Sequence, residues 1–134
     1  GQQQCRPQHE FSFCGKGGAW YGDRSQADVG YASGGSTGDY VHPTQKPVEL
    51  IVKAANNSSK PGDMVLDCFG GSGSTLIACE QTGRDARLME LDPRYCDVIV
   101  KRWQDFTGKA ATLEGDGRTF AELLAERTPE AQAA

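Results

Sequence analysis

Residues 64–90 constrain the fold of this chain more than any other stretch. The apolar run 64–66 ends on the carboxylate of Asp67 and enters a loop with three glycines in four positions. A helix-compatible segment, 74–82, follows and stops at Gly83, the residue type that most often ends a helix in a left-handed conformation. A second short apolar run comes next. Strand, glycine-rich turn, helix and strand together need about 30 residues, which predicts a βαβ unit.

Two carboxylates mark the ends of the predicted strands. Asp67 ends the first strand, and Glu90 ends the second. Parallel sheets bind their ligands in the crevice outside the carboxyl ends of the strands. We therefore expect Asp67 and Glu90 to face one ligand, although the alternative is that each carboxylate only caps its own loop.

The glycine-rich turn indicates which ligand this is. Such a turn at the start of a helix is typical of nucleotide sites. The pattern G-x-G-x-x-G is not met, because Gly71 and Gly73 are followed by Leu76, and the phosphate-binding G-x-x-x-x-G-K-[ST] pattern is absent. Asp67 would repel a diphosphate but attract an ammonium or sulfonium group. Glu90 suits two ribose hydroxyls. A cationic group facing Asp67 and a ribose facing Glu90 are together features of S-adenosylmethionine.

Three motifs resemble those of a known family. Residues 67–75 (DCFGGSGST) resemble the cofactor motif of the amino-group DNA methyltransferases, the DNA methylase N-4/N-6 family, which modify adenine N6 or cytosine N4. Residues 42–47 (HPTQKP) resemble a second signature, which precedes the cofactor loop in permuted members, and 90–95 resemble the stretch after the second strand. The resemblance covers about residues 42–106. It implies an α/β class, a partial Rossmann-like methyltransferase fold with a mostly parallel three-stranded core and flanking helices.

The resemblance and the residue chemistry together give a set of cofactor-binding candidates. Thr44 and Lys46, held at a helix start, can bind the carboxylate of the methionine moiety. Asp116, in a turn after an expected third strand at 110–113, can accept a hydrogen bond from the adenine amino group, or is a solvated turn residue. The full set for S-adenosylmethionine is Thr44, Gln45, Lys46, Asp67, Phe69, Gly71, Ser72, Gly73, Thr75, Glu90 and Asp116.

The catalytic residues of the family have no counterpart in this chain. The family holds the target amine with a [DNS]-P-P-[YFW] tetrapeptide, whose aromatic residue stacks on the flipped base. Residues 92–95 read DPRY, with arginine at the third position, and they follow the second strand. We therefore predict that Asp92 is a helix cap, with Pro93 at the first helical position. The chain is expected to begin after the catalytic region and to be inactive unless another chain supplies it.

The resemblance also divides the chain. Residues 1–41 are expected to be a loop-rich remnant of the catalytic and DNA-recognition region, 42–127 the cofactor-binding α/β domain, and 128–134 a flexible tail. Trp20 and Tyr21 in the first segment either stack on bases or anchor a surface loop. Helices are expected at 48–55, 74–82, about 93–106 and 119–126.

Composition limits the possible partners. The 134 residues carry a net charge of −4, so no global positive field attracts DNA, and DNA contact would need a local basic patch or a missing or complementary segment. The five cysteines lack C-x-x-C spacing, which argues against a zinc site. No apolar run approaches the ~18 residues of a membrane span, and a cytoplasmic protein of bacterial or phage type is expected. Two alternatives are a fragment of an NAD-binding Rossmann oxidoreductase, disfavoured by Asp67 and the missing third glycine, and a non-enzymatic folded remnant.

Overall fold

The computed structural model describes residues 18–26 and 46–127. The elements are, in order, α1 (Val48–Ser58), β1 (Met64–Asp67), α2 (Ser74–Thr82), β2 (Asp85–Leu88), α3 (Pro93–Thr107) and α4 (Phe120–Arg127). Thr44 and Gln45, the predicted tail 128–134, and all of the predicted remnant 1–41 except 18–26 lie outside the described residues.

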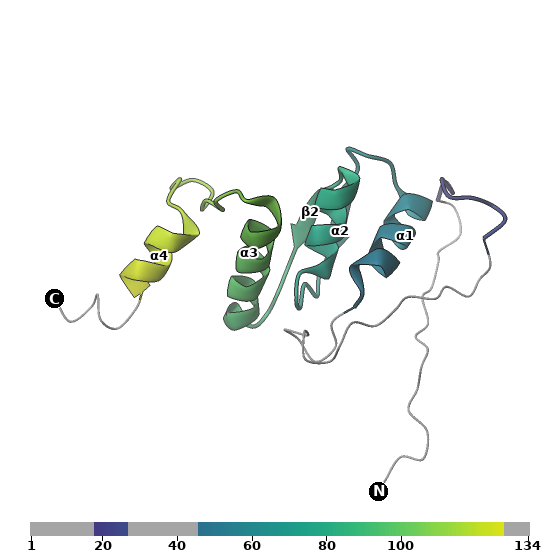
Figure 1. Cartoon of the computed structure of the whole chain (residues 1–134). Coiled ribbons are helices and arrows are strands. Elements are labelled where there is room, and N and C mark those ends of the chain that lie inside the picture. Colours follow the sequence, from purple (N-terminus) through teal and green to yellow (C-terminus); the bar gives the residue numbers. More distant parts are fainter. Residues whose placement is uncertain (1–17, 27–45, 128–134) are drawn as a thin grey trace, which may run out of the picture.

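The two strands confirm the predicted βαβ unit. They pair in parallel, with Met64 opposite Asp85 and Asp67 opposite Leu88. The helix between them, α2, packs against β2 and also against α1 and α3. Figure 1 shows α1, α2, α3 and α4 in a row, with β2 seen between α2 and α3 and with α4 at the far end. The α/β class is therefore confirmed.

The helices begin and end where local chemistry predicts. Asp92 caps α3 by accepting a hydrogen bond from the backbone N–H of Arg94 at 2.9 Å, and Pro93 occupies the first turn. Ahead of α4, Thr119 and Glu122 exchange hydrogen bonds between side chain and backbone, which is a capping box. Helix α1 extends three residues beyond the predicted 48–55, to Ser58.

The expected third strand at 110–113 is not formed as part of the sheet. Thr112 makes an isolated antiparallel bridge to Thr119, and the sheet of the described residues has two strands. The backbone N–H of Ala111 donates to the side-chain oxygen of Gln104 on α3 at 2.9 Å, and its carbonyl accepts from the first residue of α4. These local partners occupy the backbone groups of Ala111 that a strand would use for pairing in a sheet.

Helix α2 is the centre of the core. Ile77, Ala78 and Cys79 of α2 and Ile99 of α3 are buried. On β1, Met64 and Leu66 are each 65% exposed, so the helices of the described part cover only one face of the strands. No helix in the described part is long and apolar enough to span a bilayer.

The N-terminal segment 18–26 lies against the end of α1. The backbone N–H of Tyr21 donates to the carbonyl of Asn57 at 2.8 Å, and the amides of Gln26 and Asn57 pair reciprocally. The Lys60 ammonium sits 4.8 Å from the centre of the Tyr21 ring. Tyr21 therefore anchors a surface segment in this structure.

Candidate functional site

The glycine-rich loop is a tight turn that leads directly into α2. The backbone N–H of Gly73 donates to the carbonyl of Gly70 at 2.8 Å. Gly71, the second residue of this turn, has φ +52°, and Ser72 has a negative φ, the signs of a type II′ turn. Gly73 has φ +77° and is the N-cap of α2. A Cβ there would lie 3.2 Å from the side chain of Ile99 of α3, a tight contact, and the left-handed backbone angle is strained for any other residue, so both favour glycine.

Asp67 joins the end of β1 to the start of α2. One carboxylate oxygen accepts the backbone N–H of Phe69 at 2.9 Å, and the other accepts the hydroxyl of Thr75 at 2.6 Å. The carboxylate thus holds both sides of the turn. Because a carboxylate has about four acceptor positions, these two bonds leave Asp67 able to accept more.

Glu90 holds the loop to the tip of β2. One carboxylate oxygen accepts the backbone N–H of Gly71 at 2.7 Å, and the other accepts the backbone N–H of Asp92 at 3.0 Å. The backbone N–H of Gly70 also donates to the carbonyl of Met89 at 2.8 Å. Asp67 and Glu90 therefore both cap the loop, as the alternative interpretation expected. They also lie at the ends of neighbouring strands, as predicted.

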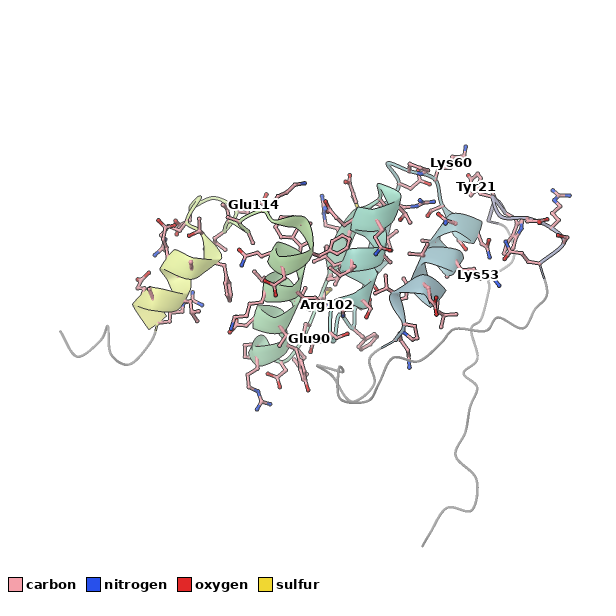
Figure 2. All side chains as sticks on the ribbon, viewed as in Figure 1. Tyr21, Lys53, Lys60, Glu90, Arg102 and Glu114 are labelled. Carbon is pink, nitrogen blue, oxygen red and sulfur yellow. The ribbon has the colours of Figure 1, made fainter. Side chains whose placement is uncertain are left out.

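The carboxyl ends of the strands face a cavity of about 260 Å³. Two acidic groups and one ammonium border it, and Figure 2 shows Glu90 at that end of the molecule, opposite Tyr21 and Lys60. The lining residues are Lys46, Ile51, Asp67, Phe69, Gly70, Gly71, Ser72, Ser74, Thr75 and Glu90. Seven of the predicted site residues are in this set. Ile51, Gly70 and Ser74 were missed, although Ile51 falls at helical spacing after the proline before α1 and Gly70 belongs to the glycine-rich loop.

Two of the described site residues, Gly73 and Asp116, are not among the residues that line the cavity. Thr44 and Gln45 lie outside the described residues. Gly73 is the N-cap of α2. Asp116 bonds the Arg118 guanidinium, whose Nε lies 2.7 Å from each carboxylate oxygen, and this hydrogen bond lowers the pKa of Asp116 below its ordinary value. Asp116 therefore has a structural partner in the turn before α4.

Arg102 is the principal contact that the sequence analysis missed. It lies on α3, and its Nη1 is 2.9 Å from the carbonyl oxygen of Ser72, 3.2 Å from that residue's hydroxyl and 3.1 Å from the hydroxyl of Ser74. Figure 2 shows it at the same end as Glu90. The available signal was a charged residue on the apolar-periodic face of an amphipathic helix.

A larger cavity of about 310 Å³ lies between α2, β2 and α3. It is bordered by Cys79, Arg84 and Trp103, among others, and contains none of the predicted site residues. Among the described residues, no group of three or more His, Cys, Asp or Glu side chains is placed to hold a metal ion. Acids border both cavities, with Glu80 and Asp85 at the larger one. The smaller cavity is the better candidate, because it lies at the carboxyl ends of the strands and the glycine-rich turn borders it.

Known proteins resemble this chain over the same region. A family model described as DNA methylase matches residues 14–101. The Type II methyltransferase M.HinfI of Haemophilus influenzae is 41% identical over 77 residues, which are 58% of this chain and 21% of that protein. The Type II methyltransferase M.Cfr9I of Citrobacter freundii is 47% identical over 64 residues, 48% of this chain and again 21% of that protein. The chain thus spans about a fifth of the length of these relatives.

One solved structure shares the fold. A crystal structure of an M1.HpyAVI–SAM complex superimposes with a TM-score of 0.54 and 28% sequence identity, over 63% of this chain and 43% of that one.

Proposed function

This chain belongs to the DNA methylase family, and from that premise we propose that it is the cofactor-binding portion of an S-adenosylmethionine-dependent DNA methyltransferase. The target would be the exocyclic amine of adenine or cytosine. The observation that carries the proposal is the pair of carboxylates at neighbouring strand ends, both bordering one cavity. The likeness to a protein solved as a SAM complex supports it.

The cavity offers a group for each end of the cofactor. Asp67 would accept hydrogen bonds from the ammonium group, and Glu90 would accept them from the ribose hydroxyls. Lys46, with Thr44, would bind the carboxylate of the methionine moiety. The remaining assignments that belong to the same proposal are Gln45, Phe69, Gly71, Ser72, Gly73 and Thr75. The hypothesis that Asp116 binds the adenine amino group is not carried into it, because Asp116 does not line the cavity and bonds Arg118.

Methyl transfer also requires a positioned amine. The reaction is an in-line displacement at the sulfonium methyl carbon, and its catalysis depends on bringing the two reactants together. No Pro-Pro pair, and hence no catalytic tetrapeptide of this family, occurs in the 134 residues. We propose that a complementary segment or partner chain supplies the tetrapeptide and most of the DNA contact.

Calorimetric titration of the chain with S-adenosylhomocysteine tests the cofactor assignment. We expect Asp67→Ala and Glu90→Ala each to weaken binding about tenfold or more, since each removes a charged hydrogen-bonding partner. Asp63→Ala and Asp85→Ala, at the opposite ends of the same strands, are the matched controls. Asp63 also accepts a backbone N–H, from Lys60 at 2.8 Å.

NAD serves as the control ligand, because it tests the oxidoreductase alternative. Tighter binding of NAD than of S-adenosylhomocysteine would contradict the proposal, and so would binding of neither ligand. If the site variants and their controls lose the same affinity for S-adenosylhomocysteine, the ligand does not bind at Asp67 and Glu90.

A second experiment tests the need for a complementary segment. The purified chain is incubated with DNA and methyl-labelled S-adenosylmethionine, and we expect no labelled DNA. Methylation by the chain alone would contradict this part of the proposal and leave the cofactor assignment intact.

A further inference from the structure

The orientation of the glycine-rich loop is not fixed by the loop alone. The peptide between Ser72 and Gly73 precedes a glycine with φ +77°. Glycine populates positive and negative φ about equally, so the φ of Gly73 alone does not fix this peptide plane. Within the loop, one hydrogen bond holds it, from the Gly73 N–H to the Gly70 carbonyl at 2.8 Å. Rotation would break that bond and turn the Ser72 carbonyl away from its present partner, so a contact to this carbonyl from outside the loop adds to the hold on one orientation.

Arg102 supplies that contact from α3. Its Nη1 donates to the Ser72 carbonyl at 2.9 Å and also lies within hydrogen-bonding distance of the Ser72 and Ser74 hydroxyls. Both serines are 5% exposed. Hydrogen bonds are stronger where water is excluded, and a charged donor roughly doubles their strength. Burial lowers the pKa of Arg102 from its ordinary value, but a guanidinium remains charged in proteins.

The same contact reaches a second wall of the cavity. The hydroxyl of Ser74 donates to the carbonyl of Lys46 at 2.9 Å, just ahead of α1. One guanidinium therefore joins α3, the glycine-rich loop and the segment that carries Lys46. Arg102 itself is not a lining residue.

We propose that Arg102 is a positioning residue for cofactor binding: together with the hydrogen bond from the Gly73 N–H to the Gly70 carbonyl, it fixes the orientation of the Ser72–Gly73 peptide and, through Ser74, sets the position of Lys46. The inference rests on the proposed function, because it assumes that the cavity binds S-adenosylmethionine. Its content is distinct, since it assigns part of the affinity to a residue outside the cavity.

A matched arginine makes the test specific. Arg84 is 8% exposed and donates to the carbonyl of Thr82 at 2.6 Å and to the carbonyl and hydroxyl of Ser59 at 2.9 and 3.2 Å, at the opposite end of the strands. Both arginines therefore bond neutral oxygens of neighbouring segments. Arg84→Met reports the effect of losing a buried structural arginine.

The experiment compares melting temperature and affinity for S-adenosylhomocysteine in the full 134-residue chain. We expect Arg102→Met to weaken binding about tenfold, the loss typical of a charged hydrogen bond. We expect Arg84→Met to lower the melting temperature at least as much, with affinity within about twofold of wild type. Arg102→Lys, which keeps a charged donor, should restore part of the affinity.

The outcomes separate this inference from the proposed function. No binding by the wild-type chain overturns the proposed function. Wild-type binding together with unchanged affinity in folded Arg102→Met overturns only the positioning role, as does an equal loss of affinity in Arg84→Met. If Arg102→Met does not fold, the single variants Arg102→Lys and Ser74→Ala and their double variant replace it. Losses of binding free energy that add in the double variant contradict a role of Arg102 through Ser74, and non-additive losses support it.

Discussion

The two ends of the two-stranded sheet use the same chemical devices for different purposes. Each end has an arginine bonded to neutral oxygens, Arg102 at the carboxyl end and Arg84 at the amino end. Each end of α2 has a glycine in the left-handed conformation, Gly73 and Gly83. The carboxyl end carries the glycine-rich loop and the cavity that Asp67 and Glu90 border, whereas at the amino end Arg84 ties the ends of α1 and α2 together. The comparison shows that residue type alone does not identify a functional arginine or glycine.

Backbone direction explains the difference. Helices α1 and α2 both end beside the amino ends of the strands, so carbonyl oxygens gather there and Arg84 satisfies them. At the carboxyl end α2 begins, and backbone N–H groups of the loop gather there instead. Asp67 and Glu90 accept hydrogen bonds from those N–H groups. A polar ligand in the cavity would therefore meet groups whose geometry is already fixed.

The largest expected difference between the two ends concerns their glycines. Gly73→Ala forces an L-residue to φ +77° with its Cβ 3.2 Å from Ile99, and we expect a loss of roughly 2–4 kcal/mol in unfolding free energy and of detectable S-adenosylhomocysteine binding. Gly83→Ala has φ +67°, but its nearest atom is 3.8 Å away, so it should cost about 1 kcal/mol and leave binding unchanged. Urea denaturation and calorimetry check both. Similar losses of binding in the two variants would contradict the expected difference between Gly73 and Gly83.

A smaller difference is expected between the threonines of α2. Thr75→Val removes the 2.6 Å hydrogen bond to Asp67, a bond to a charged group, and should cost about 1.5 kcal/mol and weaken S-adenosylhomocysteine binding several-fold. Thr82 donates to the carbonyl of Ala78, within its own helix, also at 2.6 Å. Thr82→Val should therefore leave affinity unchanged. Isothermal titration measures the affinity of both variants for S-adenosylhomocysteine. Weaker binding by Thr82→Val would contradict the expected difference.

The smallest effect concerns pH and the cap of α3. Hydrogen bonds from the Arg94 side chain and then its backbone N–H lower the pKa of Asp92 below its ordinary 3.8. Because the folded pKa is depressed, the stabilisation is complete above pH 3.8 and is lost as the pH falls through the lower folded value. Melting temperature between neutral and acid pH should show this loss in the wild-type chain. In Asp92→Asn that contribution should be absent. A fall of melting temperature at acid pH as large as in the wild-type chain would contradict this expectation.

Sequence reasoning succeeded where the determinants are local. The boundaries of α2 follow from the glycines around it, and the cap of α3 follows from adjacent Asp92 and Pro93. It failed at 110–113, where apolar residues were compatible with a third strand. The side chain of Gln104 and the bridge to Thr119 decided that segment, and neither contact has a signature in local periodicity.

The candidate site divides in the same way. The sequence by itself determined the βαβ unit, the turn that only glycines can form, and the placement of Asp67 and Glu90 at strand ends, because each depends on the order of neighbouring residues. Only the tertiary structure decided that Arg102, 30 positions beyond Ser72, holds the loop. It also decided that Ser74 donates to the carbonyl of Lys46, 28 positions earlier. Contacts between distant segments depend on helix packing, and a single sequence does not encode that packing in any short pattern.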